Sequence, residues 1–128
     1  LLDKTTDLEL QIACLRYLGK YPENRFFSIL RKLAKEGETT TPWEITAVCA
    51  SELASYPCDE TISLLIQMLY SKNWYVRNNA ASSLKKLRPT LKELQEILDG
   101  NDRFAKEILQ YYFDLSPEKE IRKGVAPT

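Results

Sequence analysis

Side chains that carry catalytic or metal chemistry are sparse in this chain. Its 128 residues include no histidine, which removes the commonest general base and metal ligand. Cys14, Cys49 and Cys58 are an odd number of cysteines, and none of them belongs to a C-x-x-C pair. The four glycines build no phosphate-binding loop. We therefore expect no catalytic residue, no metal site and no cofactor, and we expect that the chain is not an enzyme.

The three cysteines indicate reduced structural thiols, which are typical of a cytoplasmic protein. No apolar run approaches the ~20 residues that span a bilayer, and no signal peptide is visible. The chain opens on Leu1 rather than methionine, so we expect a piece of a longer protein. A cytoplasmic domain of a membrane-anchored protein is therefore a second interpretation.

Overall charge and composition limit the class of partner. Lysine plus arginine and aspartate plus glutamate number 18 each, so the net charge is zero. A basic excess is the usual footprint of binding to nucleic acids or anionic membranes, and this chain has none. We expect the partner to be another protein or the remainder of the same longer chain.

The element that must position any binding residue is the stretch from Asn73 to Leu87. Val76, Ala80, Leu84 and Leu87 recur at the spacing of one helix face. Asn73 precedes them, and its side chain can accept a hydrogen bond from an unpaired amide of the first turn. The stretch therefore predicts an amphipathic helix.

The same apolar stripe occurs in three other places. Its counterparts are Leu10, Cys14 and Leu18; Ile45, Cys49 and Leu53; and Phe104, Ile108 and Tyr112. A Tyr-Pro pair at Tyr21-Pro22 returns 35 residues later at Tyr56-Pro57, with the same offset as the first two stripes. Two landmarks that keep one offset indicate an internal repeat.

Partner helices are predicted between these stripes. Their expected ranges are about Glu23 to Gly37, about Asp59 to Tyr70, and Leu91 to Gly100, with Gly37 as a left-handed stop. Capping boxes are expected at Thr6–Glu9, Thr41–Glu44 and Thr90–Glu93, and Asn101 is expected to stand where Asn73 does. The fold is therefore predicted to be all-α, with about seven helices in antiparallel pairs. This repeat domain is expected over residues 6–115, followed by a polar, flexible tail at 116–128.

The helix at Asn73 contains the pattern Asn-x-x-Val-Arg-x-x-Ala-x-x-x-Leu, formed by Asn73, Val76, Arg77, Ala80 and Leu84. Together with the period and the paired helices, this pattern resembles the HEAT repeats of the armadillo-like group. The resemblance covers roughly residues 6–114 and implies an α-α superhelix of HEAT-like hairpins. It also implies that Arg77 bonds to neighbouring loops and locks repeats together.

By analogy with that family, the second helix of each pair lines an inner, concave wall. The polar or cationic positions expected on this wall are Arg16, Lys20, Ser51, Ser55, Asn78, Ser82 and Lys86. Such a wall suits an extended acidic peptide, although a plain solvated surface explains it equally well. In the run Tyr111-Tyr112-Phe113 we expect half core and half interface, which makes Tyr111 a further partner-binding candidate.

Trp43 and Trp74 stand at equivalent positions, each two residues before its stripe begins. They are either interface anchors or side chains that seal the bend between paired helices, and their recurrence favours packing.

HEAT-like arrays serve as protein-binding scaffolds, transport adaptors, lyase subunits and DNA-repair enzymes, so the fold alone does not select a function. The sequence favours a non-catalytic protein-interaction scaffold that is a fragment of a longer protein. The alternative is a nucleic-acid-binding or DNA-glycosylase-type HEAT-like domain, which requires a basic cleft with a converging aromatic ring and carboxylate.

Overall fold

The protein folds as seven α-helices and one short 3-10 helix, with no strand between residues 7 and 113. The computed structural model describes these residues, and for residues 37–39 it describes the backbone alone. The helices are α1 (Leu8–Lys20), α2 (Asn24–Thr40), α3 (Trp43–Glu52), η1 (Leu53–Ser55), α4 (Asp59–Met68), α5 (Trp74–Leu87), α6 (Leu91–Asp99) and α7 (Arg103–Phe113). The predicted all-α class is confirmed, and the tail predicted at 116–128 lies outside the described residues.

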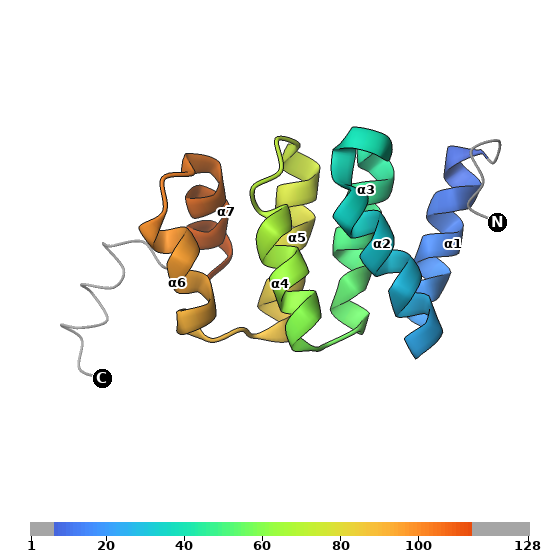
Figure 1. Ribbon diagram of the computed structural model, residues 1–128, viewed down its shortest axis with the longest axis horizontal. Coiled ribbons are helices and arrows are strands. Elements are labelled where there is room, and N and C mark those ends of the chain that lie inside the picture. Colours follow the sequence, from blue (N-terminus) through green and yellow to red (C-terminus); the bar gives the residue numbers. More distant parts are fainter. Residues whose placement is uncertain (1–6, 114–128) are drawn as a thin grey trace.

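The helices form two layers that advance in chain order from one end of the molecule to the other (Figure 1). A front layer contains α2, α4 and α6, and a back layer contains α1, α3, α5 and α7. Within the back layer α1 packs on α3, α3 on α5, and α5 on α7. Each front helix also packs on the back helix that follows it in the chain. The result is a row of stacked helical hairpins, in which each hairpin buries the apolar faces of its neighbours.

The core lies between the layers and is built from the predicted stripes of the central repeats. Cys49 and Leu53 from the second stripe and Ala80 and Leu84 from the third are completely buried, together with Leu65 of α4. Burial of a leucine side chain contributes about 1.5–3 kcal/mol, so these stripes are the main source of stability.

Two polar side chains of α5 join it to α3. The Asn79 Nδ2 atom donates to the Ala47 carbonyl at 2.8 Å, and the Ser83 hydroxyl donates to the Ala50 carbonyl at 2.6 Å. Ala47, Ala50 and Ala80 are all buried, and their small side chains let the two helices approach closely. These bonds fix how α5 sits against α3.

Two of the predicted helix caps are confirmed. Asn73 accepts from the amides of Tyr75 and Val76, at 2.8 and 3.2 Å. Thr90 and Glu93 form the reciprocal capping box at the start of α6, where each side chain bonds to the other residue's amide. Such caps satisfy amides that have no partner within the helix.

The predictions at the start and end of α2 and α3 need correction. Gly37 does not end α2, which continues to Thr40. The capping box at Thr41–Glu44 does not form, because the Thr41 hydroxyl faces back and donates to Glu36 at 3.3 Å. Only residues 41 and 42 remain between the two helices, and this short connection turns Thr41 away from α3. The first predicted box begins at Thr6, outside the described residues, and Asp7 accepts from the Glu9 amide instead.

The stripes of the two outer back helices are also corrected. Leu10 of α1 is exposed, and the residues buried against α3 are Leu15 and Leu18. In α7 the register moves by one residue, because Asp102 rather than Asn101 accepts a bond from the first turn, from the Ala105 amide at 2.9 Å. This shift buries Ala105 and Leu109 and leaves Phe104 exposed.

Within residues 7–113, each helix is too short or too polar to cross a membrane.

Candidate protein-binding surface

The eight partner-binding candidates all lie in the back layer or in the short helix that continues α3. Arg16 and Lys20 are on α1, Ser51 is on α3, Ser55 is in η1, Asn78, Ser82 and Lys86 are on α5, and Tyr111 is on α7. Asn78 and Tyr111 line the same groove, which is described below, whereas Lys20 and Ser55 lie elsewhere. Lys20 lies over the Tyr21 ring, with its Nζ atom 5.6 Å from the ring centre. Ser55 borders a separate hollow beside the two Tyr-Pro turns.

Arg16 is already bound within the protein. Its Nη1 atom lies 3.1 Å from Glu52 Oε2, which joins α1 to α3. Burial raises the pKa of Glu52, and the positive charges of Arg16 and Lys86 partly oppose this effect. Gly19 makes room for this carboxylate, since a Cβ atom at that position would overlap with Glu52 Oε1. The positive charge on this wall is therefore partly neutralised by Glu52, which weakens the case for an acidic peptide.

An exposed aromatic strip crosses the back layer from the first turns of α3 and α5 to the first and last turns of α7. We define it as Trp43, Trp74, Tyr75, Phe104 and Tyr111, whose exposed fractions range from 40% to 79%. Tyr75 joins the two tryptophans, because its ring stacks on Trp43 and meets the edge of Trp74, with centre-to-centre distances of 5.2 Å in both cases. Both tryptophans contact the Tyr75 ring and both remain substantially exposed, so a role in sealing the bend between paired helices stays a prediction.

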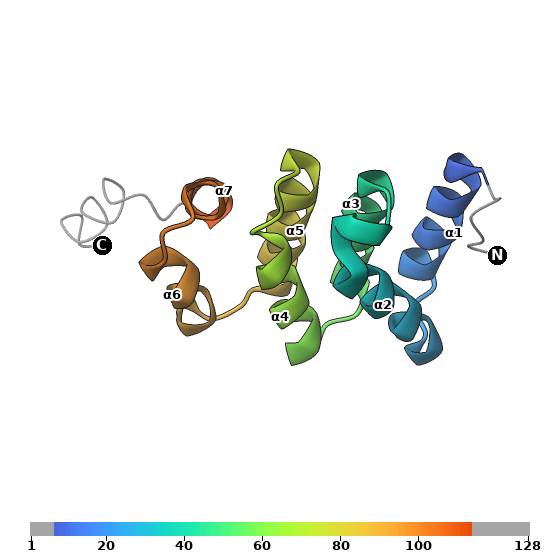
Figure 2. The ribbon, with the colours of Figure 1, turned by 45° about the horizontal axis from the view of Figure 1, so that its top comes forward.

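The strip leads into a groove between α5 and α7, which we call the α5–α7 groove. Its volume is about 430 Å³, and Trp74, Asn78, Phe104 and Tyr111 are among its lining residues. Helix α7 is seen end-on in Figure 2 while α5 is seen from the side, so the two axes diverge. This divergence opens the groove. At its base, the Tyr112 hydroxyl donates to Asn78 Oδ1 at 2.6 Å.

Arg77 is a buried residue of the groove lining, and its side chain contacts both the turn before α5 and a ring of α7. Its Nη1 atom donates to the Ser71 carbonyl at 2.9 Å, in the turn before α5. Its guanidinium also lies over the Phe104 ring, 4.9 Å from the ring centre. The predicted bond from Arg77 to a neighbouring loop is confirmed, and the side chain is buried rather than available to a partner.

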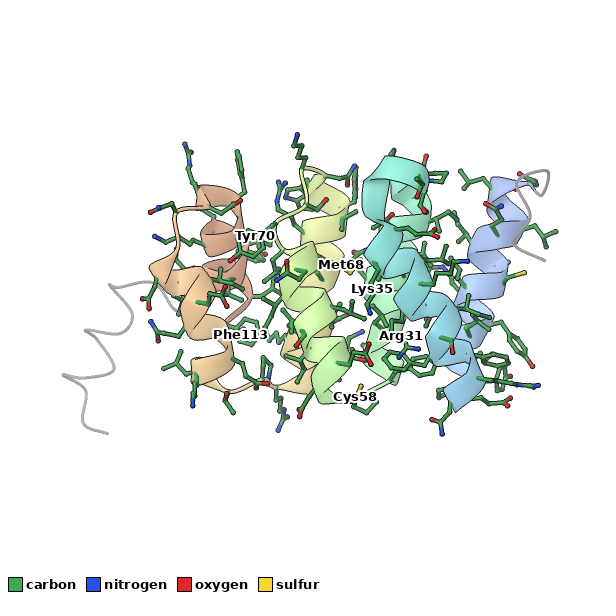
Figure 3. All side chains as sticks on the ribbon, in the orientation of Figure 1. Arg31, Lys35, Cys58, Met68, Tyr70 and Phe113 are labelled. Carbon is green, nitrogen blue, oxygen red and sulfur yellow. The ribbon has the colours of Figure 1, made fainter. Side chains whose placement is uncertain are left out.

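The front layer carries a different kind of contact. Figure 3 shows Arg31 and Lys35 reaching from α2 toward α4, where Glu60 lies 3.1 and 3.8 Å from their charged atoms. Tyr70 and Phe113 lie between α4 and the last hairpin in the same view. These side chains join neighbouring hairpins and are structural.

The cysteines are free thiols with different exposures. Cys49 is completely buried, Cys14 is half-buried and Cys58 is exposed. Burial raises the pKa of Cys49 to about 12, so its thiol stays protonated and unreactive. The expected burial is confirmed for Cys49 and only partly for Cys14.

Sequence reasoning identified Tyr111 and Asn78 but missed Tyr75 and Phe104 as surface residues. Tyr75 follows Trp74 directly, and two adjacent aromatics at the start of a helix were the available signal.

Comparison of the chain with protein-family models, with curated proteins and with solved structures finds no match. The candidate surface is therefore defined by geometry alone.

Proposed function

We propose that the chain is a non-catalytic protein-interaction scaffold of HEAT-like hairpins, which binds another protein through its back layer. The observation that supports this proposal most strongly is the aromatic strip. Apolar side chains scattered singly on a surface need no explanation, whereas a contiguous group of them marks an interaction site. Tryptophan and tyrosine are also the residues most often found at the energetic centres of interfaces.

The location of the strip supports the same proposal. Its members come from three successive back helices, so a partner that covers the strip would contact several hairpins at once. Two of the helices beneath it, α3 and α5, are held together by core packing and by the bonds from Asn79 and Ser83 to α3. A surface that is rigid before binding loses little conformational entropy when the partner docks. The free cysteines are in keeping with a cytoplasmic location.

A capture experiment with matched variants tests this function. The intact chain is immobilised and incubated with a cell extract, beside the double variant Trp74→Ser plus Tyr111→Ser. Leu91→Ser serves as the control, because Leu91 is as exposed as Phe104 but lies on α6, away from the strip. We expect partners that bind the wild type and the control to decrease about tenfold with the double variant, since buried aromatic anchors contribute 2 kcal/mol or more.

Cross-linking followed by mass spectrometry then locates the contact. The proposal requires cross-links from the captured protein to lysines close to strip residues in the chain, such as Lys72, which precedes Trp74 by two residues. Partners retained equally by all three proteins, with circular dichroism confirming equal folding, would show that the strip is not the binding surface.

A further inference from the structure

The last hairpin, formed by α6 and α7, is joined to the stack less closely than the hairpins before it. In the front layer α2 packs on α4, but α6 packs on neither α4 nor α5 to a similar extent. The packing of a front helix on the next back helix is also weaker between α6 and α7 than in the two earlier hairpins. The last hairpin is therefore held to the stack mainly by the packing of α7 on α5.

Within residues 7–113, the polar contacts between α5 and α7 join side chains to side chains. The Tyr112 hydroxyl donates to Asn78 Oδ1 at 2.6 Å, and the Arg77 guanidinium lies 4.9 Å from the centre of the Phe104 ring. Between α3 and α5, by contrast, two side chains of α5 bond directly to the main chain of α3. Side chains can turn away from each other while both helices stay intact, so α7 can leave α5 more easily than α5 can leave α3.

The turn that leads into the last hairpin contains an unusual backbone conformation. Arg88, Pro89 and Thr90 connect α5 to α6, and Arg88 has φ 54° and ψ 62°, in the left-handed region. Among residues 7–113 it is the one non-glycine residue with a positive φ. Glycine usually occupies this position after a helix, because a Cβ atom disfavours the left-handed conformation. Backbone strain is therefore held at the point where a change in two dihedral angles would swing the last hairpin.

We propose that α6 and α7 swing away from α5 about a hinge at residues 88–90, and that the bond from Tyr112 to Asn78 is the latch that holds them closed. Opening breaks the contacts between α5 and α7 and releases Arg88 from the left-handed conformation. Because the α5–α7 groove is lined by both helices, it exists only in the closed state. The inference goes beyond the proposed scaffold function, since it concerns a motion of the chain without any partner.

Hydrogen exchange of the intact chain, followed for each amide by nuclear magnetic resonance, tests this opening. A protected amide exchanges through the opening that costs the least free energy, so each region of the molecule reports its own opening. Swinging the last hairpin leaves the packing of α3 on α5 intact. Relative to their intrinsic rates, we therefore expect amides of α6 and α7 to exchange at least about tenfold faster than those at the centre of α3 and α5.

Matched variants test the latch and the hinge separately. Tyr112→Phe keeps the ring and removes the hydroxyl donor, so exchange in α6 and α7 should rise about fivefold, the size of one hydrogen bond. Tyr111→Phe makes the same change on a side chain that is 79% exposed and should leave exchange unchanged. Arg88→Gly removes the Cβ atom and relieves the closed state, so exchange in α6 and α7 should slow about fivefold. Arg88→Ala keeps the Cβ atom and should have no effect.

Three results would overturn the inference, each at a different step. Equal protection of the last hairpin and the central helices would mean that the molecule opens only as a whole. An effect of Tyr112→Phe no larger than that of Tyr111→Phe would exclude the latch. Unchanged exchange of α6 and α7 in Arg88→Gly would show that the turn is not the hinge. The capture experiment is independent of all three, because a strip that binds no partner refutes the scaffold function and leaves the opening standing.

Discussion

The Tyr56 hydroxyl caps a helix that belongs to the preceding part of the stack. It donates to the Leu18 carbonyl at 2.5 Å and is buried there. Leu18 lies in the last turn of α1, where the carbonyls have no partner within the helix. Tyr56→Phe removes this donor and keeps the ring, which stacks on Phe27 at 5.7 Å. The substitution therefore isolates one hydrogen bond between successive repeats.

The expected loss follows from the surroundings of that bond. A typical hydrogen bond contributes about 0.5–1.5 kcal/mol, and a buried acceptor left without a partner costs about 1–3 kcal/mol. We expect Tyr56→Phe to lower the free energy of unfolding by about 1–2 kcal/mol. Tyr21→Phe is the matched control, because Tyr21 stands 35 residues earlier at the equivalent position but is exposed. It should change stability by less than about 0.5 kcal/mol.

Urea unfolding monitored by circular dichroism provides the measurement. With a slope of about 1–3 kcal/mol/M, the Tyr56→Phe midpoint should fall by roughly 0.3–2 M at unchanged slope. Burial raises the pKa of Tyr56, so the protonated hydroxyl is favoured in the folded state. Its contribution is fully present below about pH 10 and is lost as the pH rises through the higher folded value. Equal midpoints for Tyr56→Phe and Tyr21→Phe at neutral pH would refute the assigned role.

Three further predictions concern the register of α7 and the buried thiol. Asp102→Ala should cost about 1 kcal/mol by removing a helix cap, whereas Asn101→Ala should stay within a few tenths, and thermal unfolding of both variants distinguishes the two registers. Leu109→Ala should cost about 2–5 kcal/mol in the same assay, and a smaller loss would mean that α7 does not bury this face. Cys58 should react with a thiol reagent in the folded protein, while Cys49 should react only after unfolding. Burial raises the pKa of Cys49 to about 12. The stability that the protonated Cys49 thiol contributes is therefore present below about pH 8.5 and is lost as the pH approaches 12. Rapid labelling of Cys49 at neutral pH would contradict its burial.

The central repeats could be predicted from the sequence because their apolar stripes are packed on both sides. The stripe containing Cys49 and the stripe containing Ala80 each face neighbouring helices, so burial follows the helical period closely. The cap at Asn73 was also predictable, because it depends only on residues within one turn.

The outer helices were less predictable, because they have fewer neighbours within the described residues. Leu10 and Phe104 fit the periodic pattern but face solvent, since burial depends on where the next helix lies and not on the period alone. Within the aromatic strip, Trp43, Trp74 and Tyr111 were candidates from the sequence, whereas Tyr75 and Phe104 were missed as surface residues. The α5–α7 groove could not be predicted, because it depends on the divergence of α7 from α5 (Figure 2), which is set by contacts far apart in sequence.

The bonds between α3 and α5 have a consequence for how the two helices can vary. Asn79 and Ser83 donate to main-chain oxygen atoms of α3, and every amino acid supplies such an atom. Positions 47 and 50 can therefore be exchanged for other small residues without loss of either bond, while α5 must retain its two donors. Substitutions can accumulate on one side of this joint without compensating changes on the other.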